Sequence, residues 1–228
     1  FPEAKIGRMD LDTTRSKKSY EKLITAFEQR NIDILVGTQM VTKGLDFENV
    51  SLVGILNANN MLNYPDFRAH ERAFQLMTQV SGRCGRKNKR GLVVLQTSTP
   101  EHPVVQQVLQ HDFTLMYETQ YAQRLQFQYP PFVRMIEITL KHKDINTVKN
   151  AAFEFANRMR SVFGSRVLGP VEPAVSRIQN LYLRQVLLKV ENTASPVKAK
   201  ELLQEIIHNL LSDNSYRRLI VSIDVDPM

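Results

Sequence analysis

Residues 79–86, Gln-Val-Ser-Gly-Arg-Cys-Gly-Arg, combine two arginines with two glycines. Their guanidinium groups suit a polyphosphate, because phosphate oxygens accept forked, charge-assisted hydrogen bonds. If the segment continues a helix from the residues before it, Arg83 and Arg86 lie opposite an apolar stripe. That stripe consists of Ala73, Met77, Val80 and Cys84. A basic, solvated helix end is the alternative interpretation, since cations stabilise a helix C-terminus.

A second segment with candidate phosphate ligands, residues 37–47, directly follows an apolar run. Its glycines, including Gly44, let a ligand approach the backbone closely. The side chains that can donate to phosphate oxygens are Thr38, Gln39 and Lys43. Asp46 either accepts a hydrogen bond from a ribose hydroxyl or caps a turn. Each residue alone is typical of an ordinary loop, but the two segments together indicate phosphate binding.

Strands that alternate with helices surround both segments. Short apolar runs predict strands at residues 4–9, 32–36, 50–56 and 92–95, and spacing of the helical type predicts helices ending near residue 30 and spanning 67–84. This alternation predicts a parallel sheet with helices on both faces. Because such sheets bind ligands at the carboxyl ends of their strands, we expect both phosphate-binding segments at that edge.

The sequence Tyr129-Pro130-Pro131-Phe132 ends a helical stretch that opens at His102-Pro103, since neither proline fits inside a helix. We place a domain boundary there, between residues 1–128 and 129–228. Beyond it we expect a strand at 133–141, a helix at 145–163, a turn at Gly169-Pro170, strands at 174–178 and 181–190, a helix at 196–211 and a strand at 218–225. This βαββαβ order predicts a split α/β sandwich.

The totals narrow the class of protein. The chain of 228 residues is 43% hydrophobic and 23% charged, as globular proteins are, and its net charge of +7 favours a polyanionic partner. A single cysteine excludes an internal disulfide framework and argues against a thiolate zinc site. Without a signal peptide or an apolar run of about 18 residues, we expect a cytoplasmic protein with no membrane partner. The start at Phe1-Pro2 suggests a fragment of something longer.

The two motif segments carry a resemblance. Gly-Thr-Gln-Met-x-x-Lys-Gly-x-Asp-Phe, followed by Pro-Asp-Phe-Arg and by residues 79–86, resembles motifs V and VI of superfamily 2 helicases. Within these, the chain resembles the bacterial primosomal replication-restart helicases through Tyr129-Pro130-Pro131-Phe132, Leu168-Gly169-Pro170 and Asp224-Val225-Asp226-Pro227. The resemblance implies an α/β fold: a second RecA-like helicase lobe, truncated at its start and with a connecting helix, in residues 1–128. A smaller α+β DNA-binding domain is implied for residues 129–228.

The same resemblance implies roles for individual residues. Arg83 and Arg86 are expected to reach the γ-phosphate of an ATP held mainly by the first lobe, with Arg86 as the arginine finger. Gly44 and Asp46 are expected to bind the nucleotide and couple its state to the grip on DNA. The expected DNA-binding residues are Thr38, Gln39, Lys43 and Gln79, the last of which could also serve the nucleotide.

The implied function is an ATP-dependent 3′–5′ DNA helicase that recognises stalled or branched replication forks and restarts replication by primosome assembly. Its expected cofactors are ATP and Mg²⁺, while the zinc of the full-length family is not expected to bind this fragment. Its expected partners are single-stranded and forked DNA, primosome proteins and single-strand-binding protein, with the protein itself monomeric.

The fragment is expected to be inactive alone. None of its nine glycines opens a Gly-Lys-Ser/Thr sequence, so it has no Walker A loop, and it has no Asp-Glu-x-His-like box. The alternative function is a non-catalytic nucleic-acid-binding or partner-docking module that retains a degenerate helicase lobe.

Three positions depart from the family's usual pattern. Asn59 stands where related sequences often carry aspartate, and Cys84 stands where alanine is usual and is interpreted as a small apolar residue. The third strand of the C-terminal domain has Tyr182-Leu183-Arg184 in place of Tyr-Arg-aromatic. Strand alternation puts Arg184 on the same face as Tyr182.

Overall fold

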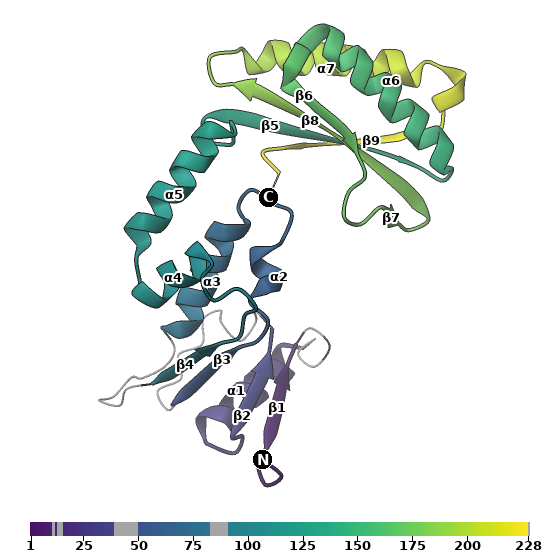
Figure 1. The fold of residues 1–228 in the computed structure, drawn as a ribbon. Helices are drawn as coiled ribbons and strands as arrows, with labels where there is room; N and C mark the ends of the chain where they lie inside the picture. Colours follow the sequence, from purple (N-terminus) through teal and green to yellow (C-terminus); the bar gives the residue numbers. More distant parts are fainter. Residues whose placement is uncertain (11, 13–15, 39–49, 83–90, 228) are drawn as a thin grey trace. The chain divides into compact units, whose positions relative to one another are not determined.

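The computed structural model describes residues 1–10, 12, 16–38, 50–82 and 91–227 (Figure 1). The chain divides into two compact units, Phe1–Gln120 and Tyr121–Met228. This division falls inside a helix, whereas the sequence places the domain boundary just after it, between residues 128 and 129. That boundary stays a prediction.

The first unit contains two parallel strand pairs connected by helices. Strand β1 (Ile6–Met9) pairs directly with β2 (Ile34–Gly37), and helix α1 (Lys17–Glu28) lies between them in the chain. Strand β3 (Leu52–Ile55) pairs with β4 (Leu92–Leu95), and α2 (Asn59–Leu62) and α3 (Ala69–Ser81) lie between them in the chain. Parallel pairing with helical connections confirms the predicted α/β class. Among the described residues, the strands form two separate pairs and not the single sheet that we expected.

The helices that follow β3 pack around a common apolar cluster, whereas α1 packs in a separate cluster around Met9. Helix α4 (Pro103–Gln110) and helix α5 (Phe113–Gln126) are separated by His111 and Asp112, and the left-handed backbone of His111 ends α4. The predicted stripe on α3 is confirmed at three positions: Ala73 and Met77 are buried, and Val80 packs against the cluster. The fourth member, Cys84, lies outside the described residues.

The second unit is an antiparallel sheet with two helices on one face (Figure 1). Its strands are β5 (Val133–His142), β6 (Val167–Val171), β7 (Arg177–Ile178), β8 (Leu181–Glu191) and β9 (Ile220–Val225). Its helices are α6 (Ile145–Phe163) and α7 (Pro196–Leu211), with short 3-10 turns at Gly164–Arg166 and Asn214–Tyr216. The sheet order β6-β8-β5-β9, with β7 also paired to β8, confirms the βαββαβ arrangement.

The predicted second strand of this motif is placed wrongly in the sequence. We expected a turn at Gly169-Pro170 and a strand at 174–178, but β6 runs through Gly169-Pro170, and only the short β7 lies in the later range. Strand β6 tolerates this glycine and proline because it is an edge strand whose register shifts between Leu168 and Val171. Gly169 is required there: its φ is +95°, and a Cβ would lie 2.8 Å from the carbonyl oxygen of Gln185.

Candidate nucleotide and nucleic-acid site

The first predicted phosphate-binding segment begins where β2 ends. Thr38 follows directly after Gly37, its side chain is exposed, and its backbone N–H donates to the carbonyl of Met9 at 3.4 Å. This bond extends the pairing with β1, so Thr38 stands at the carboxyl end of the strand pair, where the sequence places it. The other predicted residues of this segment, Gln39, Lys43, Gly44 and Asp46, lie outside the described residues.

The second predicted segment begins at the end of α3. Gln79 is exposed on the last turn of this helix, whose final residue is Ser81. The N–H of Gly82 donates to the carbonyl of Thr78 at 3.0 Å and caps the helix. Arg83 and Arg86 follow and lie outside the described residues, so their predicted roles stay predictions.

The first segment follows the carboxyl end of a strand, whereas the second segment lies between a helix and the amino end of a strand. Thr38 leaves the carboxyl end of β2, whereas the chain after Gly82 leads to the amino end of β4, which starts at Leu92. We expected both segments at one carboxyl edge. Residues 83–90 lie outside the described residues, so that expectation stays a prediction.

An ion pair that the sequence pattern does not indicate anchors the start of α3. One carboxylate oxygen of Asp66 accepts from Nη1 of Arg72 at 2.6 Å, and the other accepts from the backbone N–H of Arg68 at 2.8 Å. Arg72 of α3 is therefore held by a carboxylate. Sequence reasoning missed this contact because Asp66 lies before the helix, outside the helical spacing of Arg72.

Asn59 has a structural role at the carboxyl ends of β3 and β4. Its Oδ1 accepts from the hydroxyl of Thr97 at 2.7 Å, and its Nδ2 donates to Oγ of Ser98 at 2.8 Å. An amide both donates and accepts, and an ionised aspartate only accepts, so the asparagine satisfies this pair of contacts. Asn59, in place of an aspartate, thus links the start of α2 to the segment after β4 through these hydrogen bonds.

Two histidines meet where α3 and α4 pack together. The rings of His70 and His102 are 5.1 Å apart, and Nδ1 of His102 accepts from the backbone N–H of Val104 at 3.2 Å. Burial, and then the neighbouring His102, lower the pKa of His70 below its usual value. The contact serves packing of the unit, and within the described part of the chain no third metal-ligating side chain joins the two histidines.

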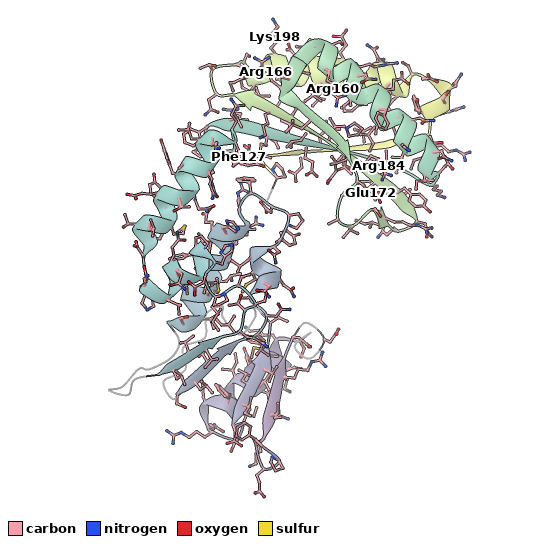
Figure 2. All side chains as sticks on the ribbon, in the orientation of Figure 1. Phe127, Arg160, Arg166, Glu172, Arg184 and Lys198 are labelled. Atoms are coloured by element: carbon pink, nitrogen blue, oxygen red, sulfur yellow. The ribbon has the colours of Figure 1, made fainter. Side chains whose placement is uncertain are left out.

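In the second unit, Arg184 is engaged by a carboxylate. Its Nη2 lies 2.9 Å from Oε2 of Glu172, and the side chain of Arg184 is only 13% exposed. Figure 2 labels both residues. Strand register places Tyr182 opposite His142 and Arg184 opposite Leu140, so the two residues share a face as predicted.

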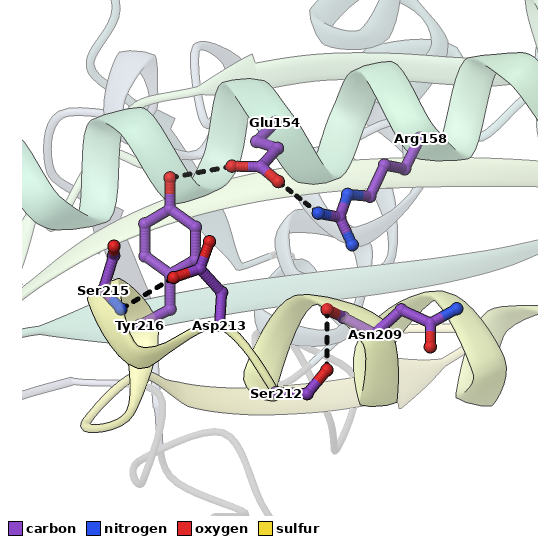
Figure 3. Close-up of polar contacts among 7 residues, drawn as sticks. All are labelled: Glu154, Arg158, Asn209, Ser212, Asp213, Ser215 and Tyr216. Carbon is purple, nitrogen blue, oxygen red and sulfur yellow. Dashed lines mark hydrogen bonds and ion pairs between the residues drawn. The ribbon is translucent and has the colours of Figure 1, made fainter.

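A polar cluster ties the 3-10 turn after α7 to α6 (Figure 3). The hydroxyl of Tyr216 donates to Oε2 of Glu154 at 2.9 Å, and Oε1 of Glu154 pairs with Arg158. Burial, and then the hydrogen bond to Glu154, raise the pKa of Tyr216. Because the carboxylate is already neutralised by Arg158, the cluster acts as a brace between elements and not as an acid–base pair.

Two general findings limit what the described residues can hold. Over these residues, no three His, Cys, Asp or Glu side chains lie together in a way that could bind a metal ion. In the same part of the chain, no helix combines the length and apolar character that spanning a membrane requires.

Comparisons with known proteins match both parts of the chain. The family described as "Helicase conserved C-terminal domain" matches residues 3–88, and the family described as "Primosomal protein N C-terminal domain" matches residues 125–228. The chain is 38% identical over 229 residues to the replication restart protein PriA of Bacillus subtilis and 37% identical over 231 residues to that of Treponema pallidum. The chain belongs to the PriA family.

The match to PriA covers only part of these relatives. All of the chain aligns, but it spans 28% of the Bacillus subtilis protein, 34% of the Treponema pallidum protein and 27% of the Synechocystis protein, with which it is 35% identical. The helicase match includes β1 through α3 and all the predicted nucleotide- and DNA-binding residues. The primosomal match includes the whole sheet of the second unit, so the chain corresponds to a C-terminal part of PriA.

Proposed function

We propose that this chain is the C-terminal part of an ATP-dependent 3′–5′ DNA helicase that recognises stalled or branched replication forks and restarts replication by primosome assembly. The observation that carries the proposal is the succession, in one chain, of a helicase C-terminal domain and a primosomal C-terminal domain. The working protein contacts single-stranded and forked DNA, primosome proteins and single-strand-binding protein. It acts as a monomer in the cytoplasm.

The donor set of this chain fits the phosphates of ATP, because guanidinium groups bind phosphate oxygens in a forked, charge-assisted manner. Arg86 takes the arginine-finger position, Arg83 binds the γ-phosphate beside it, and Gly44 and Asp46 contact the nucleotide. The first lobe supplies the remainder of the ATP and Mg²⁺ site. Bound Mg²⁺ supplies charge neutralisation of the phosphates.

The DNA strand lies along Thr38, Gln39, Lys43 and Gln79 in this proposal. What supports it in the structure is the exposure of Thr38 and Gln79 on the described flanks of the two motif segments. A hydroxyl and an amide there can donate to backbone phosphates without reading sequence. Such contacts suit a motor that moves along any strand.

The isolated chain should show no DNA-stimulated ATP hydrolysis. The lysine of a Walker A loop and the acidic box that positions Mg²⁺ are both missing from its sequence. Phosphate release measured with single-stranded DNA should therefore equal the buffer blank, while a full-length PriA protein serves as the positive control. Turnover that Arg86→Ala abolishes would show that this chain holds a complete site.

Single-stranded DNA should bind the chain with a marked salt dependence. The net charge of +7 favours contacts to phosphate, and each neutralised phosphate releases a counterion. For about three phosphate contacts the slope of log affinity against log salt is about −2, so the Kd should rise about 15-fold between about 50 and 200 mM salt. Fluorescence anisotropy of a labelled oligonucleotide measures this. Affinity that does not change with salt would instead favour the partner-docking module.

A further inference from the structure

The start of β8 forms a tight hairpin with β7, referred to as the β7–β8 hairpin (residues 177–182; Figure 1). Ile178 pairs with Leu181, so the loop consists only of Gln179 and Asn180. Both loop residues have positive φ, 49° and 64°, as a type I′ turn requires. The hairpin is therefore a well-defined projection and not an irregular loop.

Within this hairpin, Arg177 is held in place by an aromatic ring and an amide. The carbon of its guanidinium lies 4.9 Å from the ring centroid of Tyr182, and its Nη2 donates to Oδ1 of Asn180 at 3.1 Å. Tyr182 is itself partly buried against the core cluster of the second unit. Because its support is fixed, the guanidinium plane is preorganised although Arg177 is exposed.

The charge of Arg177 is not neutralised by a carboxylate of the described residues. Other arginines of this unit form ion pairs, as Arg184 does with Glu172 and Arg166 does with Glu191. The acidic Asp144, in the same region of the sheet, already accepts from the N–H and hydroxyl of Thr147 at the start of α6. A partner that approaches the hairpin therefore meets an uncompensated cation.

The neighbouring strand adds further cationic and aromatic character. Register places His142 of β5 opposite Tyr182, and Tyr182 opposite Arg177, so these three residues form a row across three strands on one face. Lys143 follows directly after His142 and is exposed. A planar cation supported by an aromatic ring suits a nucleobase, which is flat and stacks.

We propose that the β7–β8 hairpin is a stacking contact for single-stranded nucleic acid, in which one unpaired base lies on the guanidinium plane of Arg177. Tyr182 supports that plane from below, and Asn180 fixes its edge. The inference rests on the proposed DNA-binding function and adds the element through which the second unit contacts an unpaired strand. A duplex does not fit as well, because its bases are already stacked on one another.

The test uses the complete 228-residue chain and a single-stranded oligonucleotide that carries fluorescent 2-aminopurine. Arg177→Ala should weaken binding about tenfold, the scale of one lost base-stacking contact, and should remove the fluorescence quenching caused by stacking. Arg177→Lys keeps the charge but loses the plane, so it should behave almost like the alanine variant. Asn180→Gly keeps the left-handed turn and loses the amide, so its loss should be smaller.

Arg134→Ala is the matched control. This exposed arginine pairs with Val190, at the opposite end of the β5–β8 ladder and roughly 26 Å from Tyr182 at about 3.3 Å per residue. The Arg134→Ala substitution removes one positive charge, as Arg177→Ala does, but leaves the hairpin unchanged. It should therefore change the affinity for single-stranded DNA only slightly. Circular dichroism and melting temperature should be unchanged in all four variants.

The outcomes separate this inference from the proposed function. Normal binding and quenching by Arg177→Lys would overturn the stacking contact and leave DNA binding by the chain in place. Equal losses in Arg177→Ala and Arg134→Ala would overturn it as well, because they would show a general charge effect. A wild-type chain that binds no single-stranded DNA at low salt would overturn both proposals. Equal sensitivity of a duplex probe to Arg177→Lys would contradict recognition of unpaired bases.

Discussion

Arg86→Ala, in a complete two-lobed PriA enzyme that carries this chain, should lower ATP turnover on the order of 10³-fold or more. The expected loss is large because phosphoryl transfer spreads negative charge over the equatorial oxygens of the γ-phosphate. A positioned guanidinium stabilises that charge in the transition state more than in the ground state. Turnover is measured as phosphate release at saturating single-stranded DNA and ATP.

The lysine variant and DNA affinity provide the controls for this prediction. Arg86→Lys should recover little turnover, because an ammonium group lacks the planar fork of the guanidinium. DNA affinity should hardly change in either variant, since Arg86 faces the nucleotide in the proposed arrangement. If Arg86 were only a solvated charge at a helix end, alanine would cost a few tenths of a kcal/mol of stability and leave turnover intact. Normal turnover would therefore refute the arginine-finger assignment.

Phe155→Ala should unfold the second unit at a much lower temperature. Phe155 of α6 is fully buried in the cluster that joins both helices to the sheet. Removing a buried phenylalanine side chain costs about 3–5 kcal/mol, through lost burial and the cavity left behind. For a domain of this size the melting temperature should fall by roughly 15 °C or more. Differential scanning calorimetry measures the change.

Phe153 of the same helix is the matched control, because its side chain is 51% exposed. Phe153→Ala should change the free energy of unfolding by about 0.5 kcal/mol or less. The transition that belongs to the first unit should be the same in both variants, provided the two compact units unfold separately. Similar losses in the two variants would contradict the packing of α6 on the sheet described here.

Several elements are predictable from the sequence because local patterns determine them. The bounds of β4, α6 and α7 match the expected residues. In α6 and α7, Asp144 and Ser195 accept hydrogen bonds from backbone N–H groups of the first turn, so each helix start has a local cap. Apolar spacing within these helices depends only on residues three or four positions apart. The family is likewise predictable from the sequence, because each of its motifs is a short run of neighbouring residues.

Tertiary structure alone decided the contacts between residues with no shared local period. Arg72 pairs with Asp66, and Arg184 pairs with Glu172. Proline and glycine at 169–170 signal a turn, but an edge position in the sheet makes them part of β6. The placement of Arg177 on Tyr182 depends on a two-residue loop and on strand register. Such partners are selected by the packing of the whole unit, so residue spacing does not specify them.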